Sequence, residues 1–258
     1  MASSPVVGLI YDHLPSPAWV KVAHELVAGI DVMAERCSGS GSHGGASEEL
    51  LRSCWSLALL VELVRGVEFK RSALFGIGEK PILADLLGVM PAPAVADLQS
   101  LERAFREHLV PLVLARDGEL AAGPAFSSLL PGDADLIKGR TLIEIKAMVH
   151  RRNRDGTPRY SVDARMLYQV LAYALLSQER FSVDEVVIFN ARYAHVYSWR
   201  LSSLLAELAG SSVETHELAA ELKMFLKNPV DQCVPLGARR AALAVFERAG
   251  IPQVLSTR

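Results

Sequence analysis

The segment from Gly132 to Lys146 constrains the possible fold of this chain more than any other part of the sequence. Two short runs of β-compatible residues lie on either side of Lys138-Gly139-Arg140, where the glycine favours a tight turn. Because alternate residues of a strand share a face, Glu144 and Lys146 lie on one face of the second run and its isoleucines on the other. We therefore predict a hairpin of two neighbouring strands in the second half of the chain.

This hairpin would bring acidic groups together. Asp133 and Asp135 share a face of the first strand, and the tight turn places Asp135 beside Glu144 and Lys146. Two converging carboxylates repel each other unless a cation lies between them. Their oxygen atoms favour hard ions such as Mg²⁺ or Mn²⁺. A neighbouring lysine can orient a water molecule or neutralise charge on a phosphate, so the pattern indicates a site for phosphodiester hydrolysis.

An exposed hairpin edge is the alternative interpretation of the same residues. In that case Glu144 and Lys146 would only face solvent. The flanking Leu142, Ile143 and Ile145 favour a central, buried strand instead. No Ser/His/Asp or Cys/His constellation stands out in the sequence, so we expect water to be the nucleophile.

The remaining pattern divides the chain into a helical first part, a mixed middle and a helical end. Apolar residues at helical spacing predict helices over residues 17–34, 48–67, 95–114, 162–177, 201–209, 214–226 and 238–249. β-compatible runs predict strands over residues 121–126, 134–137, 141–147, 186–191 and 195–199. We expect an α/β fold with a small mixed sheet and a core of order αβββαβ. The predicted regions are a helical annex (1–94), the core (95–200) and a helical tail packed on it (201–258).

Composition restricts the class of protein. The chain has 258 residues, of which 50% are hydrophobic and 22% are charged, which is typical of a packed globular protein. The net charge of −2 means that any nucleic-acid site must use local positive charge. Three widely spaced cysteines are a poor disulfide framework, and no signal peptide or membrane span is recognisable. We therefore expect a cytoplasmic protein that does not enter a membrane.

Three motifs, in order along the chain, resemble those of the PD-(D/E)XK nuclease superfamily. Gly132-x-x-Asp135 followed by Glu144-x-Lys146 is similar to the signature of that family. Gln169-Val-Leu-Ala-Tyr173 resembles the QxxxY motif of its RecB-like branch. The resemblance covers about residues 101–199, and the restriction-endonuclease-like core of the family has the αβββαβ order expected above.

The resemblance implies a role for each motif residue. Asp135 and Glu144 would ligate Mg²⁺ or Mn²⁺, and Lys146 would act on the water or on the phosphate. Gln169 and Tyr173 lie four positions apart, on one face of a helix, which in the family flanks the active site and helps to hold DNA or the lysine. Taken alone, that pair indicates a helix surface whose tyrosine packs on the core. The implied activity is hydrolysis of DNA by a metal-activated water, with RNA a less favoured substrate.

Further carboxylates are candidate metal ligands. Asp133 shares the face of Asp135 and would be an extra ligand or a group that supports the ligands. RecB-like members also use a Glu or His on the helix before the first strand, and we choose Glu102 for this role. Glu62 on the apolar second helix is its rival, because a carboxylate there needs a partner. The other candidates on the third helix are Glu107 and His108.

A basic stretch behind the second strand of the hairpin predicts contacts with nucleic acid. Arginine side chains suit phosphate oxygens, and contacts to phosphate carry no sequence information. Tyr160 could stack on an unpaired base, as could Tyr168, for which core packing is favoured. A solvated loop is the alternative interpretation of this stretch. The residues predicted to contact nucleic acid are Arg151, Arg152, Arg154, Arg159 and Tyr160.

The alternative function is a catalytically inactive nucleic-acid-binding or scaffold module that retains the nuclease fold. Such a module would not need an intact set of reactive side chains. Asp135, Glu144 and Lys146 are all present in this sequence, which favours the enzyme.

Overall fold

The computed structural model describes residues 10–39, 46–126, 129, 130, 132–149, 154–156 and 161–227, with the backbone alone for 37–39. The helix predicted over residues 238–249 lies outside these ranges. The chain forms two compact units, Met1–Arg103 and Ala104–Arg258. Within the described ranges, no helix is long and apolar enough to cross a lipid bilayer.

The first unit is helical, as its apolar periodicity predicts. Its core is formed by buried residues of several helices, and Trp19 at its centre is completely buried. The Trp19 indole N–H donates to the carbonyl oxygen of Gly78 at 3.0 Å. The elements are α2 (Pro17–Gly39), α3 (Glu48–Val64), the short 3₁₀ segments η1 (Phe69–Arg71) and η2 (Ala73–Ile77), α4 (Leu83–Gly88) and α5 (Ala92–Ala104).

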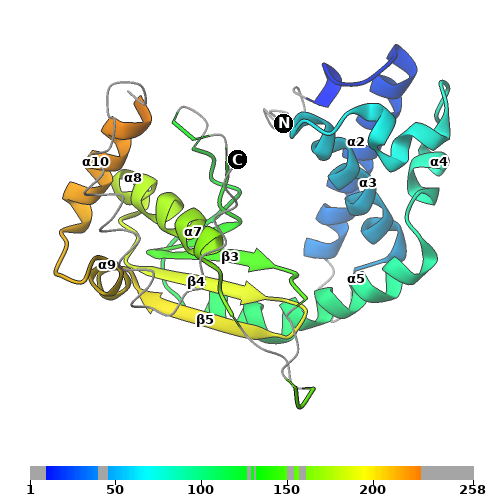
Figure 1. Cartoon of the computed structure of the whole chain (residues 1–258). Coiled ribbons are helices and arrows are strands. Elements are labelled where there is room, and N and C mark those ends of the chain that lie inside the picture. Colours follow the sequence, from blue (N-terminus) through cyan, green and yellow to red (C-terminus); the bar gives the residue numbers. More distant parts are fainter. Residues whose placement is uncertain are drawn as a thin grey trace. The chain divides into compact units, whose positions relative to one another are not determined.

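The second unit is built on a five-stranded mixed sheet with flanking helices (Figure 1). The strand order is β1-β2-β3-β4-β5, in which β3 and β4 run parallel and the other neighbours run antiparallel. The strands are β1 (Leu120–Ala122), β2 (Leu136–Lys138), β3 (Thr141–Lys146), β4 (Glu185–Asn190) and β5 (His195–Arg200).

The edge of the sheet departs from the predicted strand bounds. β1 ends at Ala122, because Gly123 has a positive φ of 60° and Pro124 has no backbone N–H to donate. Beyond this break, Ala125 pairs with Asp133 in an isolated bridge. β2 begins at Leu136, two residues later than predicted. The predicted tight turn is present, with Gly139 at φ 56°.

Helix α7 (Ala164–Leu176) connects the parallel strands β3 and β4 and lies across one face of the sheet (Figure 1). A parallel pair needs such a crossover, and the Asp163 side chain caps the helix by accepting from the Met166 N–H. The helices that follow are α8 (Gln178–Phe181), α9 (Leu201–Ala209) and α10 (Thr215–Lys227).

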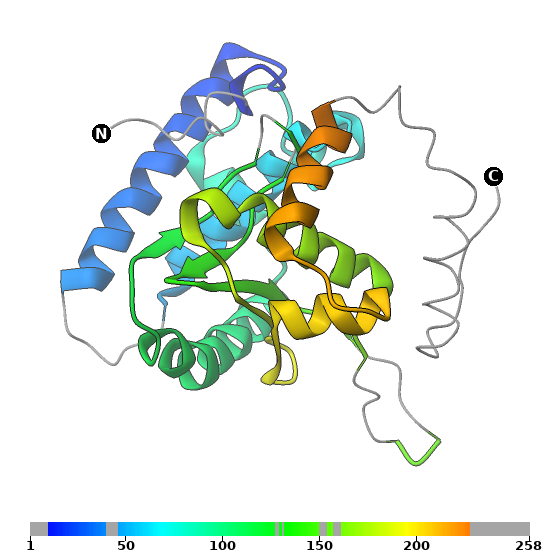
Figure 2. The same cartoon turned by 90° about the vertical axis from the view of Figure 1, so that its left-hand side faces the viewer.

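The apolar core of the second unit lies between the sheet and α7. Leu142 and Ile188 from the sheet pack in one cluster with Val170 and Ala174 of the helix. The same cluster contains Leu205 of α9 and other residues of α9 and α10. Both views show α10 beside α7 (Figures 1 and 2), so within the described part of the tail α10 packs on the helix that covers the sheet.

The helix predicted over residues 95–114 contains an irregular turn. The π-helical segment η3 (Phe105–Leu109) separates α5 from α6 (Val110–Leu114). Pro111 accounts for this, because a proline inside a helix lacks the N–H and clashes with the carbonyl group four residues earlier. A π-turn removes that clash by shifting the register of the backbone hydrogen bonds.

A polar cluster holds three strands together on the face opposite α7. The Arg116 guanidinium donates to both carboxylate oxygens of Glu185, at 2.8 and 3.1 Å. Thr141 of β3 and Ser198 of β5 donate their hydroxyl groups to the same carboxylate, at 2.9 and 2.6 Å. Burial raises the pKa of Glu185, but the hydrogen bonds from Arg116, Ser198 and Thr141 outweigh it and lower the pKa overall.

We expect this cluster to stabilise the fold in a pH-dependent manner. Arg116→Ala should lower the free energy of unfolding by about 1.5–3 kcal/mol, the usual contribution of hydrogen bonds to a charged group. Because the folded-state pKa of Glu185 lies below its ordinary value of 4.5, its stabilisation is present above that pH and is lost as the pH falls through the folded-state pKa. Urea denaturation between neutral and acid pH measures both effects. An unchanged acid limb in Glu185→Gln would contradict the assignment.

Candidate active site

The hairpin of β2 and β3 brings the two predicted metal ligands together. Leu136 pairs with Ile143, so the next pair along the hairpin places Asp135 opposite Glu144. The Asp135 carboxylate oxygen Oδ2 accepts the backbone N–H of Ile145 at 2.6 Å. Asp135 therefore lies just before β2, and its side chain is fixed against β3.

Glu144 is a buried carboxylate in a central strand, with a relative exposure of 3%. Its Oε1 atom accepts the ammonium group of Lys146 at 2.6 Å. Its Oε2 atom is buried and has no hydrogen-bond partner among the residues that the structure describes. Burial raises the pKa of Glu144 and the charge of Asp135 raises it further, while Lys146 and, more weakly, the backbone of Asp135 lower it by hydrogen bonding; the net direction is upward.

Helix α7 supplies the residues that hold Lys146. The Lys146 ammonium group donates to the side-chain oxygen of Gln169 at 3.2 Å. The side-chain amide nitrogen of Gln169 in turn donates to the hydroxyl oxygen of Tyr173 at 3.2 Å. Tyr173 lies one helical turn further along α7. The three predicted motifs therefore meet in one continuous set of polar contacts.

Gly132 makes room for Tyr173. A Cβ atom at position 132 would lie 2.7 Å from the Tyr173 hydroxyl oxygen, closer than real Cβ contacts allow. The ring of Tyr173 also stacks on Phe126, with centroids 5.0 Å apart. The glycine of the first motif is thus required by the tyrosine of the last one, and the tyrosine packs on the core as well as contacting Gln169.

The arrangement is suited to a divalent cation. Glu144 contributes a buried oxygen that lacks a hydrogen-bond partner among the described residues, and Asp135 lies beside it, so a cation there would relieve both the desolvation of Glu144 and its repulsion with Asp135. Both donors are hard carboxylate oxygens, and one or two protein carboxylates commonly suffice to bind Mg²⁺. Within the described residues, no group of three or more His, Cys, Asp or Glu side chains is placed to hold a metal.

The other candidate carboxylates do not join this cluster as a metal-binding group. Asp133 is exposed beside the isolated bridge, and Glu102 belongs to α5 of the first unit. Glu62 is exposed on α3, so the expectation that its carboxylate needs a partner is wrong. Glu107 and His108 are exposed on η3. Metal ligation by Asp133 or Glu102 stays a prediction.

Little of the basic stretch falls within the described residues. Arg154 is described and is exposed to solvent. Tyr168 is 51% exposed, so the expectation that it packs in the core is wrong. The predicted nucleic-acid contacts Arg151, Arg152, Arg159 and Tyr160 lie outside the described residues.

Asn190 is a residue of the site region that sequence reasoning missed. It pairs with Lys146 across the parallel strands and is completely buried. Its side-chain nitrogen donates to the Met148 carbonyl at 3.2 Å, and its side-chain oxygen accepts the Arg192 backbone N–H at 3.2 Å. Asn190 therefore holds the segment that follows β3, at Met148, and the segment that follows β4, at Arg192. The signal in the sequence is an amide that ends the apolar run of β4.

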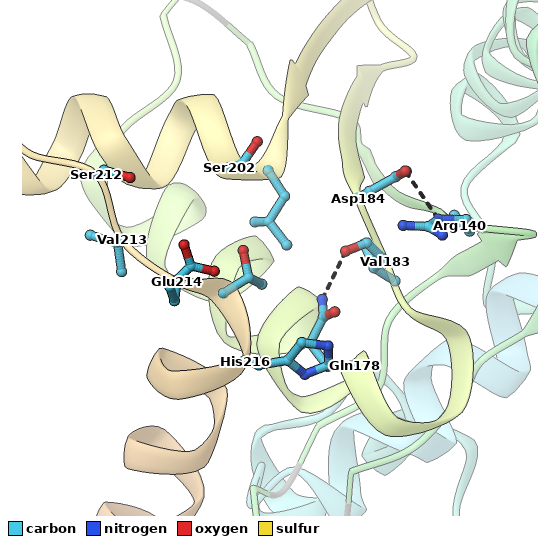
Figure 3. Close-up of a pocket in the computed structure, with 11 residues that line it drawn as sticks. Arg140, Gln178, Val183, Asp184, Ser202, Ser212, Val213, Glu214 and His216 are labelled. Carbon is cyan, nitrogen blue, oxygen red and sulfur yellow. Dashed lines mark hydrogen bonds and ion pairs between the residues drawn. The ribbon is translucent and has the colours of Figure 1, made fainter.

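A cavity of about 370 Å³ lies at the opposite end of the sheet (Figure 3). Its lining includes Arg140, which immediately precedes β3, and Asp184, which immediately precedes β4. The Arg140 guanidinium forms an ion pair with Asp184 at 3.0 Å, and the Gln178 amide donates to the Val183 carbonyl at 2.8 Å. None of the predicted site residues lines this cavity.

Comparisons with protein-family models, curated proteins and solved structures find no match for this chain.

The contact between Gly132 and Tyr173 can be tested by a double-mutant cycle. Gly132→Ala should lower the free energy of unfolding by about 1–3 kcal/mol, because the added methyl group overpacks the site. In a Tyr173→Phe background the same change should cost less, because the hydroxyl group that it meets is gone. Chemical denaturation of the four proteins measures the coupling. Equal costs of Gly132→Ala in both backgrounds would show that the two residues do not meet.

Proposed function

We propose that this chain is a metal-dependent nuclease of the PD-(D/E)XK type that hydrolyses phosphodiester bonds of DNA, with RNA a less favoured substrate. The observation that carries the proposal is the convergence of Asp135, Glu144 and Lys146 around a buried carboxylate oxygen of Glu144 that has no hydrogen-bond partner among the described residues. A structural ion pair would satisfy that oxygen, because an unsatisfied buried acceptor costs about 1–3 kcal/mol.

The order of elements supports a restriction-endonuclease-like core. The helix that ends at Leu114 is followed by β1, β2, β3, α7 and β4, which is the order αβββαβ. Lys146 and Asn190 lie at the carboxyl ends of the parallel strands β3 and β4. Ligand sites of open α/β sheets commonly lie outside the carboxyl ends of their strands.

In this proposal Asp135 and Glu144 hold one Mg²⁺ or Mn²⁺ ion. When bound, the ion would act as a Lewis acid on a phosphoryl oxygen. Asp135 is kept in place by the Ile145 N–H, which donates to its Oδ2 atom. Glu144 is held between its strand neighbours, so neither carboxylate has to be ordered when the ion arrives.

Lys146 is the proposed catalytic cation. Its ammonium group would orient the attacking water or donate hydrogen bonds to the phosphate as negative charge develops. Gln169 is a positioning residue, since it contacts Lys146 and is itself held by Tyr173. Gln169 therefore keeps Lys146 in the cluster after a cation has replaced the Lys146 ammonium group beside Glu144.

Metal binding is the first test of the proposal. Mn²⁺ binds the folded state, so it should stabilise the wild type by about 2.7 kcal/mol at a hundred times its Kd. Asp135→Asn and Glu144→Gln preserve shape but remove the charges, and both should abolish the rise in Tm. Asp184→Asn, at the other end of the sheet, is the matched control and should respond as the wild type does. An equal Mn²⁺ response in all four proteins would refute the metal site.

Cleavage separates the nuclease from an inactive module of the same fold. In Mg²⁺ or Mn²⁺, the wild type should cleave at least one member of a panel of linear, circular and single-stranded DNA and RNA. Lys146→Ala should keep the Mn²⁺ response but lose about 10²–10³-fold in rate, as loss of an electrostatic group does in other enzymes. Lys138→Ala removes a half-buried lysine of β2 that donates to the Gly118 carbonyl, and should cleave normally. A metal-binding wild type that cleaves nothing would favour the inactive module.

A further inference from the structure

Helix α7 carries a second cation close to Lys146. Arg165 lies four residues before Gln169, so the two side chains are about 6 Å apart along the helix and about 40° apart around it. Gln169 contacts the Lys146 ammonium group directly. Arg165 is exposed, so its guanidinium can extend over the same side of the cluster.

The described part of the fold gains little from this arginine. Within the described part of the chain, no hydrogen bond or ion pair involves the Arg165 guanidinium. The residue lies in the first turn of α7, where the helix dipole favours negative charge and disfavours a cation. Among the described residues no structural role accounts for Arg165, whereas a phosphate would provide a negative charge for its guanidinium.

Tyr168 lies three residues after Arg165 and adjoins Gln169 in the sequence. Its ring is 51% exposed, although neighbouring side chains of the same helix, Met166 and Val170, are buried. Residues three apart on a helix are neighbours, so the guanidinium and the ring form one surface. An exposed tyrosine beside an arginine offers a stacking face for a base and a donor for its phosphate.

We propose that Arg165 and Tyr168 form a binding site for an unpaired nucleotide next to the phosphate that is cleaved. Arg165 binds the backbone phosphate, and Tyr168 stacks on the base. Because a base in a duplex has both faces covered by its neighbours, this surface selects single-stranded or frayed substrate. The proposal deepens the nuclease function and rests on it.

The test measures binding separately from cleavage. Glu144→Gln in Mg²⁺ is the background, so that a labelled single-stranded DNA oligonucleotide and the corresponding duplex are not consumed during fluorescence anisotropy. Arg165→Gln should reduce the slope of log affinity against log salt by about 0.7 for the single strand, which corresponds to one phosphate contact. Arg140→Gln is the matched control, because Arg140 lies about 20 Å from Lys146 along β3, is exposed and should leave the slope unchanged.

The tyrosine has its own pair of variants. Tyr168→Ala should weaken single-strand binding by about 5- to 150-fold, the usual effect of losing one stacked base, and should leave duplex binding nearly unchanged. Tyr168→Phe keeps the ring and should bind as the background protein does. Melting curves of every variant verify folding, and Arg165→Gln should not lower Tm, because it removes a cation from the positive end of a helix.

The outcomes separate this proposal from the nuclease function. Cleavage by the wild type, together with unchanged binding in both Arg165→Gln and Tyr168→Ala, would overturn the nucleotide site and leave the nuclease standing. Equal losses for duplex and single strand in Tyr168→Ala would overturn the stacking role. A wild type that cleaves no substrate refutes the nuclease function. In that case the nucleotide site is also rejected if the Glu144→Gln protein binds no single-stranded DNA. Reduced kcat/KM for single-stranded substrate in otherwise wild-type Arg165→Gln, with the Mn²⁺ response retained, would support the proposal.

Discussion

The burial of the Glu144 carboxylate is the constraint around which the second unit is organised. A carboxylate at 3% exposure in a strand between apolar neighbours is costly unless it is paired or bound to a cation. Lys146 satisfies one oxygen from the same face of the same strand, and the other oxygen has no partner within the described part of the chain. The fold tolerates this cost because β3 is enclosed by β2, by β4 and by α7.

Two carboxylates in the same sheet differ in how many side-chain hydrogen bonds they accept. Glu185 accepts hydrogen bonds from Arg116, Thr141 and Ser198, and its pKa is lowered. Glu144 has one side-chain donor, and its pKa is raised. Where a carboxylate holds strands together, as Glu185 does, the fold therefore supplies hydrogen-bond donors for it. An incompletely satisfied acid at the carboxyl end of β3 is the kind of exception that calls for a functional explanation.

The sequence predicts the parts of the site that depend on local periodicity. The alternation in β3 and the turn at Gly139 predict that Asp135 and Glu144 meet, and the spacing of Gln169 and Tyr173 predicts a shared helix face. Contacts that depend on the packing of distant elements are not predictable in this way. The closeness of Gly132 to Tyr173 and the double role of Asn190 require the crossover geometry. The choice between Glu102 and Glu62 also lies beyond sequence reasoning, because periodicity does not determine how a helix is rotated; ligation by Glu102 stays a prediction.

The crossover between β3 and β4 has a consequence for the order in which the site is formed. Asp135 and Glu144 belong to a hairpin closed by two residues, which is a contact that short chains make quickly. Lys146 contacts Gln169 of α7 and pairs with Asn190 of β4. The connection between β3 and β4 must fold into a helix and dock before β4 can pair with β3. During synthesis, the acidic pair therefore exists before the lysine is restrained. If the proposed metal site is correct, the nascent chain acquires both proposed cation ligands before the lysine that would act beside them is held in place.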